Sequence, residues 1–194
     1  VNHSRYFTRT IGQDLYLGFI HIKDLETNAS KRIVAERESN GEYLDLEDFI
    51  FRTTLPKQQI ILLIRTGALR FTKLTKPELL WKAHMLIGEK KNELRSPKMF
   101  HSPTQNYELP ELEQNVLEDA YDEIELLGFP ISLSHFDMLK TSFRGEVFAR
   151  NLMNWVGSVK RLVGRLVTIK YVRTVKGEIM NFAAFVDMNG EFFD

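Results

Sequence analysis

Apolar residues recur at helical spacing through the first half of the chain, and this pattern predicts a series of short helices. Gly41 and Gly67 are expected to end two of them, because glycine readily takes the left-handed conformation found at helix ends. Residues 1–22 alternate more closely and favour short extended segments, so residues 1–91 are expected to be mainly helical. The expected helices begin at Thr27, after the capping residue Asp45, at Pro56 and at Pro77.

The second half of the chain combines one further helix with strands. An apolar stripe on an acidic segment predicts a helix that ends at Gly128. From Trp155 onward the pattern changes to runs of β-branched residues, which turns at Thr174–Glu178 and Met188–Glu191 separate into strands. The expected fold class is therefore mainly α with a small β part. The stripe consists of Leu112, Val116, Ala120, Ile124 and Leu127.

Residues 92–110 have the composition of an exposed linker, because prolines stand there among short polar residues. This composition suggests a boundary between separately folded parts. The expected division is a helical domain at 1–91, a linker at 92–110, a helical connector at 111–154 and a β domain at 155–194.

Composition and charge narrow the classes of function. No apolar run is long enough to cross a membrane, and the N-terminus does not look like a signal peptide. The chain has no cysteine, which excludes disulfides and cysteine-based zinc sites and fits a reducing cytoplasm. The 26 basic residues balance 26 acidic ones, so nucleic-acid binding would depend on local patches. Charge is in fact segregated, since residues 108–125 carry only acids and residues 140–176 carry cations with one acid, Glu146.

The turn between the third and fourth expected helices is the main candidate site. Unpaired backbone N–H groups at Gly67, Ala68 and Leu69 would form an anion site, and nearby cations would add Coulomb attraction. Such a turn can hold a phosphate of duplex DNA. The alternative is an ordinary helical hairpin with solvated basic residues. The nearby cations are Arg65, Arg70, Lys73 and Lys76.

The predicted strands carry cations interleaved with aromatic residues, a pattern typical of single-strand binding sites. The alternative is a basic, solvated strand face with aromatic residues in the core. The candidate residues are Arg165, Lys170, Tyr171, Arg173, Lys176 and Phe182.

Two other groups of polar residues invite a chemical interpretation. Asp45, Glu47 and Asp48 could hold a metal ion, but capping of the following helix explains these acids more simply. His135 has no second histidine, cysteine or acid at ligand spacing, so we expect it to serve packing or hydrogen bonding. No catalytic residue, metal ligand or cofactor site is predicted.

Motifs in both halves of the chain resemble the alpha subunit of bacterial DNA polymerase III, the C-family replicative polymerase. The motifs are Leu17-Gly18-x-x-x-Ile22-Lys23, Arg32-Ile33-Val34-Ala35-x-Arg37, Leu46-Glu47-Asp48-Phe49, Ile64-Arg65-x-Gly67-Ala68-Leu69 and Arg173-Thr174-x-Lys176-Gly177-x-x-Met180-x-Phe182. A leucine-glycine turn before a Ser-x-His segment, at residues 125–136, is also similar to the family. The order and spacing of these motifs cover more than half of the chain.

The resemblance implies a tandem helix-hairpin-helix region, then a linker, then the start of an oligonucleotide-binding (OB) barrel. In the first hairpin, where the family often has glycines, this chain has Asp24 and Glu26, whose carboxylates would repel phosphate. The second hairpin, at Gly67, is thus the expected DNA contact. An OB barrel needs five strands and about three fit here, so we expect the chain to be a piece of a longer protein.

The resemblance also suggests a partner for the linker. In the family, a short Gln-x-x-(Leu/Met)-Phe peptide in this region docks into the sliding clamp. Ser96-Pro97-Lys98-Met99-Phe100 is similar, with serine in place of glutamine, and Met99 and Phe100 would be the anchors. Alternatively, Met99 and Phe100 pack back on the helices.

The function that follows is a non-catalytic, DNA- and clamp-binding region of a cytoplasmic bacterial polymerase. Polymerisation, with its Mg²⁺, would belong to the parent DNA-directed DNA polymerase; the sequence leaves open whether that is the main replicase or an error-prone relative. A second hypothesis is a protein-interaction scaffold whose hairpins are structural and do not bind DNA. A third, a small nuclease with a metal on Asp45, Glu47 and Asp48, would show magnesium-dependent cleavage.

Overall fold

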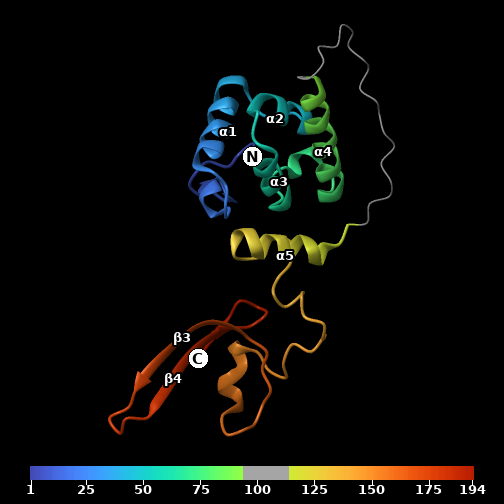
Figure 1. The fold of residues 1–194 in the computed structure, drawn as a ribbon. Coiled ribbons are helices and arrows are strands. Elements are labelled where there is room, and N and C mark those ends of the chain that lie inside the picture. Colours follow the sequence, from blue (N-terminus) through green and yellow to red (C-terminus); the bar gives the residue numbers. More distant parts are fainter. Residues whose placement is uncertain (94–113) are drawn as a thin grey trace. The chain divides into compact units, whose positions relative to one another are not determined.

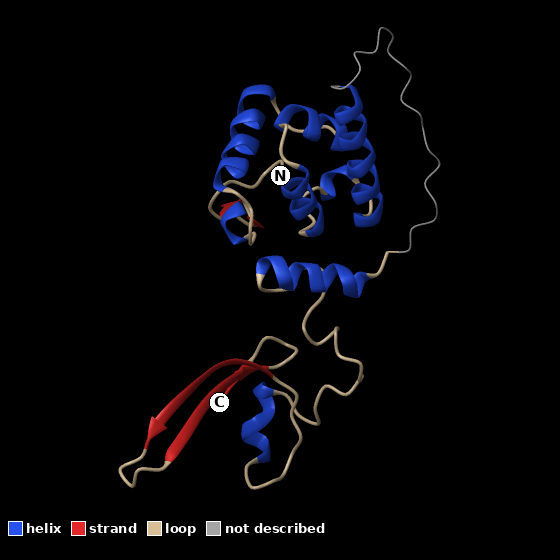
Figure 2. Cartoon of the chain, viewed as in Figure 1, coloured by secondary structure: helices blue, strands red, loops and turns tan. Residues whose placement is uncertain are grey.

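The computed structural model describes residues 1–93 and 114–194, and the chain divides into two compact units, Val1–Leu133 and Ser134–Asp194. The predicted fold class, mainly α with a small β part, is confirmed (Figures 1 and 2). Most of the predicted linker, with Met99 and Phe100, lies outside the described residues, as does Leu112. None of the described helices has the length and apolar content that crossing a membrane requires.

Helices α1 to α4 build most of the first unit. Helix α3 packs on α4, α2 packs on both α1 and α4, and α5 contacts α3 (Figure 1). A short antiparallel hairpin of β1 and β2 precedes the helices, as the alternating pattern predicts. The elements are β1 (Arg9–Ile11), β2 (Asp14–Tyr16), α1 (Thr27–Asn40), α2 (Leu46–Thr53), α3 (Lys57–Arg65), α4 (Lys76–Glu93) and α5 (Val116–Leu127), with 3-10 turns at Phe19–His21 and Arg70–Thr72.

Local sequence signals explain most helix ends. The Asp45 carboxylate accepts a 2.8 Å hydrogen bond from the Asp48 N–H at the start of α2, which confirms the capping interpretation. Thr75 and Glu78 form a reciprocal capping box before α4, with the Thr75 N–H donating to the Glu78 carboxylate at 2.7 Å. Gly41 ends α1 with φ of 83°.

The core of the first unit lies between these helices. Its fully buried side chains come from α1, α2, α3 and the turn after α3, so the hairpin sequence itself contributes to the core. Burial of each large apolar side chain stabilises the fold by roughly 1.5–3 kcal/mol. These residues include Ile33, Phe49, Ile60, Leu63, Ile64 and Leu69.

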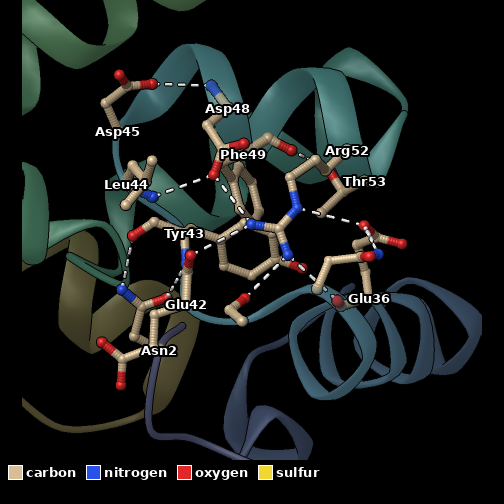
Figure 3. Close-up of polar contacts among 12 residues, drawn as sticks. Asn2, Glu36, Glu42, Tyr43, Leu44, Asp45, Asp48, Phe49, Arg52 and Thr53 are labelled. Carbon is tan, nitrogen blue, oxygen red and sulfur yellow. Dashed lines mark hydrogen bonds and ion pairs between the residues drawn. The ribbon is translucent and has the colours of Figure 1, made fainter.

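Arg52 of α2 ties that helix to the C-terminal end of α1 (Figure 3). Its guanidinium donates to the backbone carbonyls of Glu36 and Gly41 at 3.2 and 2.9 Å. It also pairs with the carboxylates of Glu36 and Asp48 at 3.2 and 3.0 Å. Only 14% of the Arg52 side chain is exposed, so these bonds are shielded from solvent.

Tyr43 forms the floor of the same cluster (Figure 3). The Arg52 guanidinium lies 4.5 Å from the centre of the Tyr43 ring, and the Tyr43 hydroxyl donates to the Ile33 carbonyl at 2.8 Å. The Asn2 side chain bridges to the Tyr43 backbone in both directions, at 2.9 and 3.0 Å. The cluster therefore joins α1, α2 and the N-terminal segment.

Helix α5 departs from the expected pattern of burial. The sequence predicts that the apolar stripe through Val116 and Ala120 is buried, but Val116 is 48% exposed. Ala120 is buried as expected, but the other buried positions are Glu123 and Leu126. The helix turns its acidic side to α3 because that surface is cationic, as described below. Helix α5 belongs to the first compact unit.

The second unit is a three-stranded antiparallel sheet in the order β3-β4-β5, with an irregular segment before it. Its elements are β3 (Arg165–Arg173), β4 (Ile179–Val186), β5 (Phe192–Phe193) and a 3-10 turn at Ala149–Trp155. Figure 2 shows β3 and β4 as a long two-stranded ribbon. The pairing shifts between Leu166 and Thr168, which indicates a bulge in β3. The strand begins at Arg165, later than the predicted run from Val159.

Two residues explain the turn and the bend at the base of this sheet. The Asp187 carboxylate accepts hydrogen bonds from the N–H groups of Ala149, Asn189 and Glu191 at 2.9–3.0 Å. A Cβ at Gly164 would lie 2.5 Å from the Phe193 ring, so this position requires glycine, as its place at a predicted bend suggests. The predicted OB barrel stays a prediction.

The Arg52 cluster leads to a first prediction. Arg52→Lys should lower the free energy of unfolding by about 1–3 kcal/mol, because an ammonium cannot reproduce the fork of shielded hydrogen bonds. Urea unfolding of the full chain measures this change. Arg32→Lys, at an exposed position of α1, is the matched control and should leave the midpoint unchanged. Equal midpoints for the two variants would show that the Arg52 bonds add nothing net.

Candidate nucleic-acid interface

The turn after α3 is built as a helix C-cap. Gly67 has φ of 69°, the Gly67 N–H donates to the Ile64 carbonyl and the Ala68 N–H donates to the Leu63 carbonyl, both at 2.9 Å. The prediction that these two amides are bare is therefore wrong, because they satisfy carbonyls at the end of α3. Leu69 is fully buried in the core. Any anion affinity of this hairpin must come from its cations.

Arg65 makes the most extensive ion pairs of the second hairpin. Its guanidinium reaches the Asp122 carboxylate through Nε at 2.9 Å and Nη2 at 2.5 Å, and Nη2 also lies 2.6 Å from the Glu125 carboxylate. The hydrogen bond with Asp122 raises the pKa of Arg65, so the guanidinium stays charged. Both acids belong to α5.

Arg70 and Lys76 also pair with α5. Arg70 Nη2 donates to the Glu123 carboxylate at 2.7 Å, and Lys76 Nζ lies 3.3 Å from the Asp119 carboxylate. The Arg70 side chain also lies against Gly67, where a Cβ would come within 2.8 Å of Nε. Of the four predicted hairpin cations, Arg65, Arg70 and Lys76 therefore neutralise acids of α5.

Lys73 is the exception among the predicted cations. It is exposed, has φ of 61° and ends the 3-10 turn at Arg70–Thr72. Within the part of the chain that the structure describes, no ion pair involves Lys73. Its charge is therefore available to an anion in solvent.

The first hairpin also meets α5. The Lys23 N–H donates to the Leu126 carbonyl at the end of α5, at 2.8 Å. Buried Gln59 of α3 supports this hairpin, since its side chain accepts from the Glu26 N–H at 2.8 Å and donates to the Asp24 carbonyl at 3.3 Å. Helix α5 thus contacts both hairpins.

Glu123 is a central residue that the sequence did not identify. Its carboxylate is fully buried and accepts bonds from Arg70, from the N–H groups of Ile131 and Ser132 at 2.6 and 2.8 Å, and from the Ser132 hydroxyl at 3.0 Å. Helical spacing places Glu123 on the same face as Ala120 and Leu127, but a charged side chain on that face was not expected to be buried. Gln59 was missed for a similar reason, since a glutamine in the polar run Lys57-Gln58-Gln59 looks like a surface residue.

The strand residues predicted to bind a single strand do not share one face. Lys170 pairs with Phe182 across the ladder, and Arg165 pairs with Val186, which lies on the same side of β4 as Phe182. Tyr171 and Arg173 point to the opposite face, since successive strand residues alternate. Lys176 lies in the turn between the strands. One face therefore carries Arg165, Lys170 and Phe182.

The predicted metal and histidine positions have ordinary structural roles. Asp48 accepts from the Leu44 N–H at 3.1 Å and pairs with Arg52, while Asp45 caps α2. In residues 1–93 and 114–194 no group of three or more His, Asp or Glu side chains is placed to hold a metal ion. Burial lowers the pKa of His135, and the charge of Arg165 lowers it further.

Comparisons with known proteins agree with the sequence motifs. The family described as "Helix-hairpin-helix motif" matches residues 1–79. The chain is 29% identical over 178 residues to DNA polymerase III subunit alpha of Aquifex aeolicus. The aligned region covers 89% of this chain and 15% of the relative. The chain is 28% identical over 199 residues to the same subunit of Staphylococcus epidermidis, covering 97% of this chain and 18% of the relative.

The chain spans less than a fifth of the length of these curated relatives. Its similarity to them runs through both compact units rather than through the hairpins alone. Residues 1–79 therefore carry the helix-hairpin-helix motif, and the resemblance of the chain to the DNA polymerase III alpha subunit family is confirmed.

Proposed function

We propose that this chain is a non-catalytic DNA-binding region of a polymerase alpha subunit and grips the duplex backbone at its hairpins. The helix-hairpin-helix match over residues 1–79 carries the proposal, because the motif is the one feature that both the sequence and the comparisons place in the same residues. Phosphate contacts position a protein on DNA without reading bases, which suits a polymerase that must move along any sequence.

The gripping groups in this proposal are side chains rather than amides. Lys73 offers an unpaired charge, and Arg65, Arg70 and Lys76 surround it in the same segment. Gly67, Ala68 and Leu69 shape the turn that holds these cations. With so few phosphate contacts, binding by this region alone should be weak, with a Kd on the order of 10⁻⁴–10⁻⁶ M at physiological salt.

Two finer elements of the proposal concern other partners. Met99 and Phe100 would anchor a peptide in a sliding clamp, a role that rests on the resemblance of residues 96–100 to the family's clamp peptide. The face of the β3-β4 ribbon with Lys170 and Phe182 would bind single-stranded DNA. Polymerisation, its Mg²⁺ and a bacterial cytoplasmic location belong in this proposal to the whole polymerase.

One observation favours a second candidate function, a protein-interaction scaffold. Three hairpin cations already pair with carboxylates of α5, as a purely structural hairpin would require. In that case the hairpins would serve packing, and α5 or the residue 96–100 peptide would meet a protein partner.

Lys73→Glu separates the two functions. If the hairpin grips DNA, the variant should lose about one phosphate contact, so the affinity for a labelled primer-template duplex falls several-fold and the slope of log K against log salt shrinks by about 1. Fluorescence anisotropy at low and moderate salt measures both. Lys82→Glu, an exposed lysine of α4, is the charge-matched control. A scaffold would show no duplex binding, or equal binding by both variants.

The register of the β3-β4 ribbon predicts a difference between two aromatic residues. Phe182→Ala should weaken binding of an oligothymidylate by about 5- to 100-fold, because a stacked base is worth roughly 1–3 kcal/mol. Tyr171→Ala should have little effect, since Tyr171 lies on the face opposite Lys170. Anisotropy with the labelled oligonucleotide tests this, after circular dichroism has verified that both variants fold. Equal losses, or a larger loss for Tyr171→Ala, would exclude this face.

A further inference from the structure

The carboxylates of α5 occupy the cations that a DNA phosphate would use. Asp122 and Glu125 hold Arg65, Glu123 holds Arg70, and Asp119 holds Lys76. The Leu126 carbonyl at the end of the same helix accepts a hydrogen bond from the Lys23 N–H of the first hairpin. A row of negative charges along one side of α5 therefore lies on the second hairpin, and the end of the helix contacts the first through a backbone hydrogen bond.

We propose that α5 is an intramolecular competitor of DNA: docked, it covers the hairpins, and a duplex binds there only when α5 is released. The inference rests on the proposed function and concerns its regulation. It also explains why a motif that matches a DNA-binding hairpin has most of its cations neutralised in the free chain.

The way α5 is packed makes release feasible. Three of its apolar residues, Val116, Leu117 and Tyr121, are 48%, 42% and 60% exposed. Its inward side buries Ala120, Glu123 and Leu126, and Leu127 packs partly against the core. Ion pairs add to this attachment, and the partly exposed pairs of Arg65 with Asp122 and Glu125 weaken with salt and can exchange with another anion.

The bonds that shape α5 would survive release. Asn115 caps the helix by accepting the Leu117 N–H at 3.0 Å, and Gly128 ends it in the left-handed conformation. Glu123 keeps its bonds to Ile131 and Ser132, which follow α5 in the chain and move with it. Of the bonds that Glu123 makes, only the one to Arg70 would break.

The hairpin cations can exchange a carboxylate of α5 for a phosphate of DNA, so they need not lose a partner when α5 is released. Arg70 is 55% exposed even in its pair with Glu123, so a phosphate can approach the guanidinium from solvent. Each cation that leaves a carboxylate of α5 can donate its hydrogen bonds to a phosphate oxygen instead, with similar geometry. The net gain is the entropy of counterions released from the DNA.

The test neutralises the two acids that hold Arg65. Asp122→Asn with Glu125→Gln should tighten binding of a 20-base-pair duplex by about three- to tenfold in low-salt anisotropy, because α5 then competes less well for the hairpin. The control pair, Glu47→Gln with Glu118→Gln, changes net charge equally at exposed positions and should tighten binding less. Equal tightening by the two pairs, or none by the first, would overturn the competition.

Hydrogen exchange of the unaltered chain gives a second test that does not depend on any variant. Adding saturating duplex should speed exchange of the α5 amides and slow exchange around Lys73. Unchanged or slower exchange in α5 would overturn the inference while leaving DNA binding intact. If neither the chain nor any variant binds duplex at low salt, the proposed function fails, and the competition fails with it.

Discussion

Ion pairing between the second hairpin and α5 is the interaction on which the arrangement of the first unit depends. It joins cations near residue 70 to acids near residue 122 and so draws α5 onto the hairpins. Without it the acidic side of α5 would face solvent and the three cations would stand unpaired on one turn. Opposite charges placed about fifty residues apart in the sequence thus decide where α5 packs.

The features that were predictable from the sequence depend on neighbours in the chain. A carboxylate three residues before an N–H, as at Asp45, indicates a helix start from the local sequence alone. A glycine after the last helical turn, as at Gly67 and Gly128, indicates a helix end in the same way. The burial of Gln59 depends instead on the first hairpin, and that of Glu123 on Arg70 and on the residues that follow α5. A polar or charged side chain is ordinarily solvated, which is why only the structure identified these two residues as buried.

It was harder to predict which side of a helix or strand is buried than to predict where the helix or strand lies in the sequence. Periodicity located α5 correctly, but the apolar side was expected inward, and a cationic neighbour reversed the preference for part of the helix. Alternation located β3 and β4, whereas the bulge near Val167 changed which residues share a side. In both cases the composition of an element is a local property, and the direction of its side chains is set by what it packs against.

A cation with a protein partner can still serve DNA, and the contrast between two arginines shows what decides this. Arg52 is 14% exposed and binds two carboxylates as well as two backbone carbonyls, so removing it from these partners would break several bonds at once. Arg70 is 55% exposed and is held by one carboxylate. For Arg52 the fold is the only feasible partner. For Arg70 a phosphate can replace Glu123 at little cost to the guanidinium, so pairing in the free chain is compatible with a role in binding.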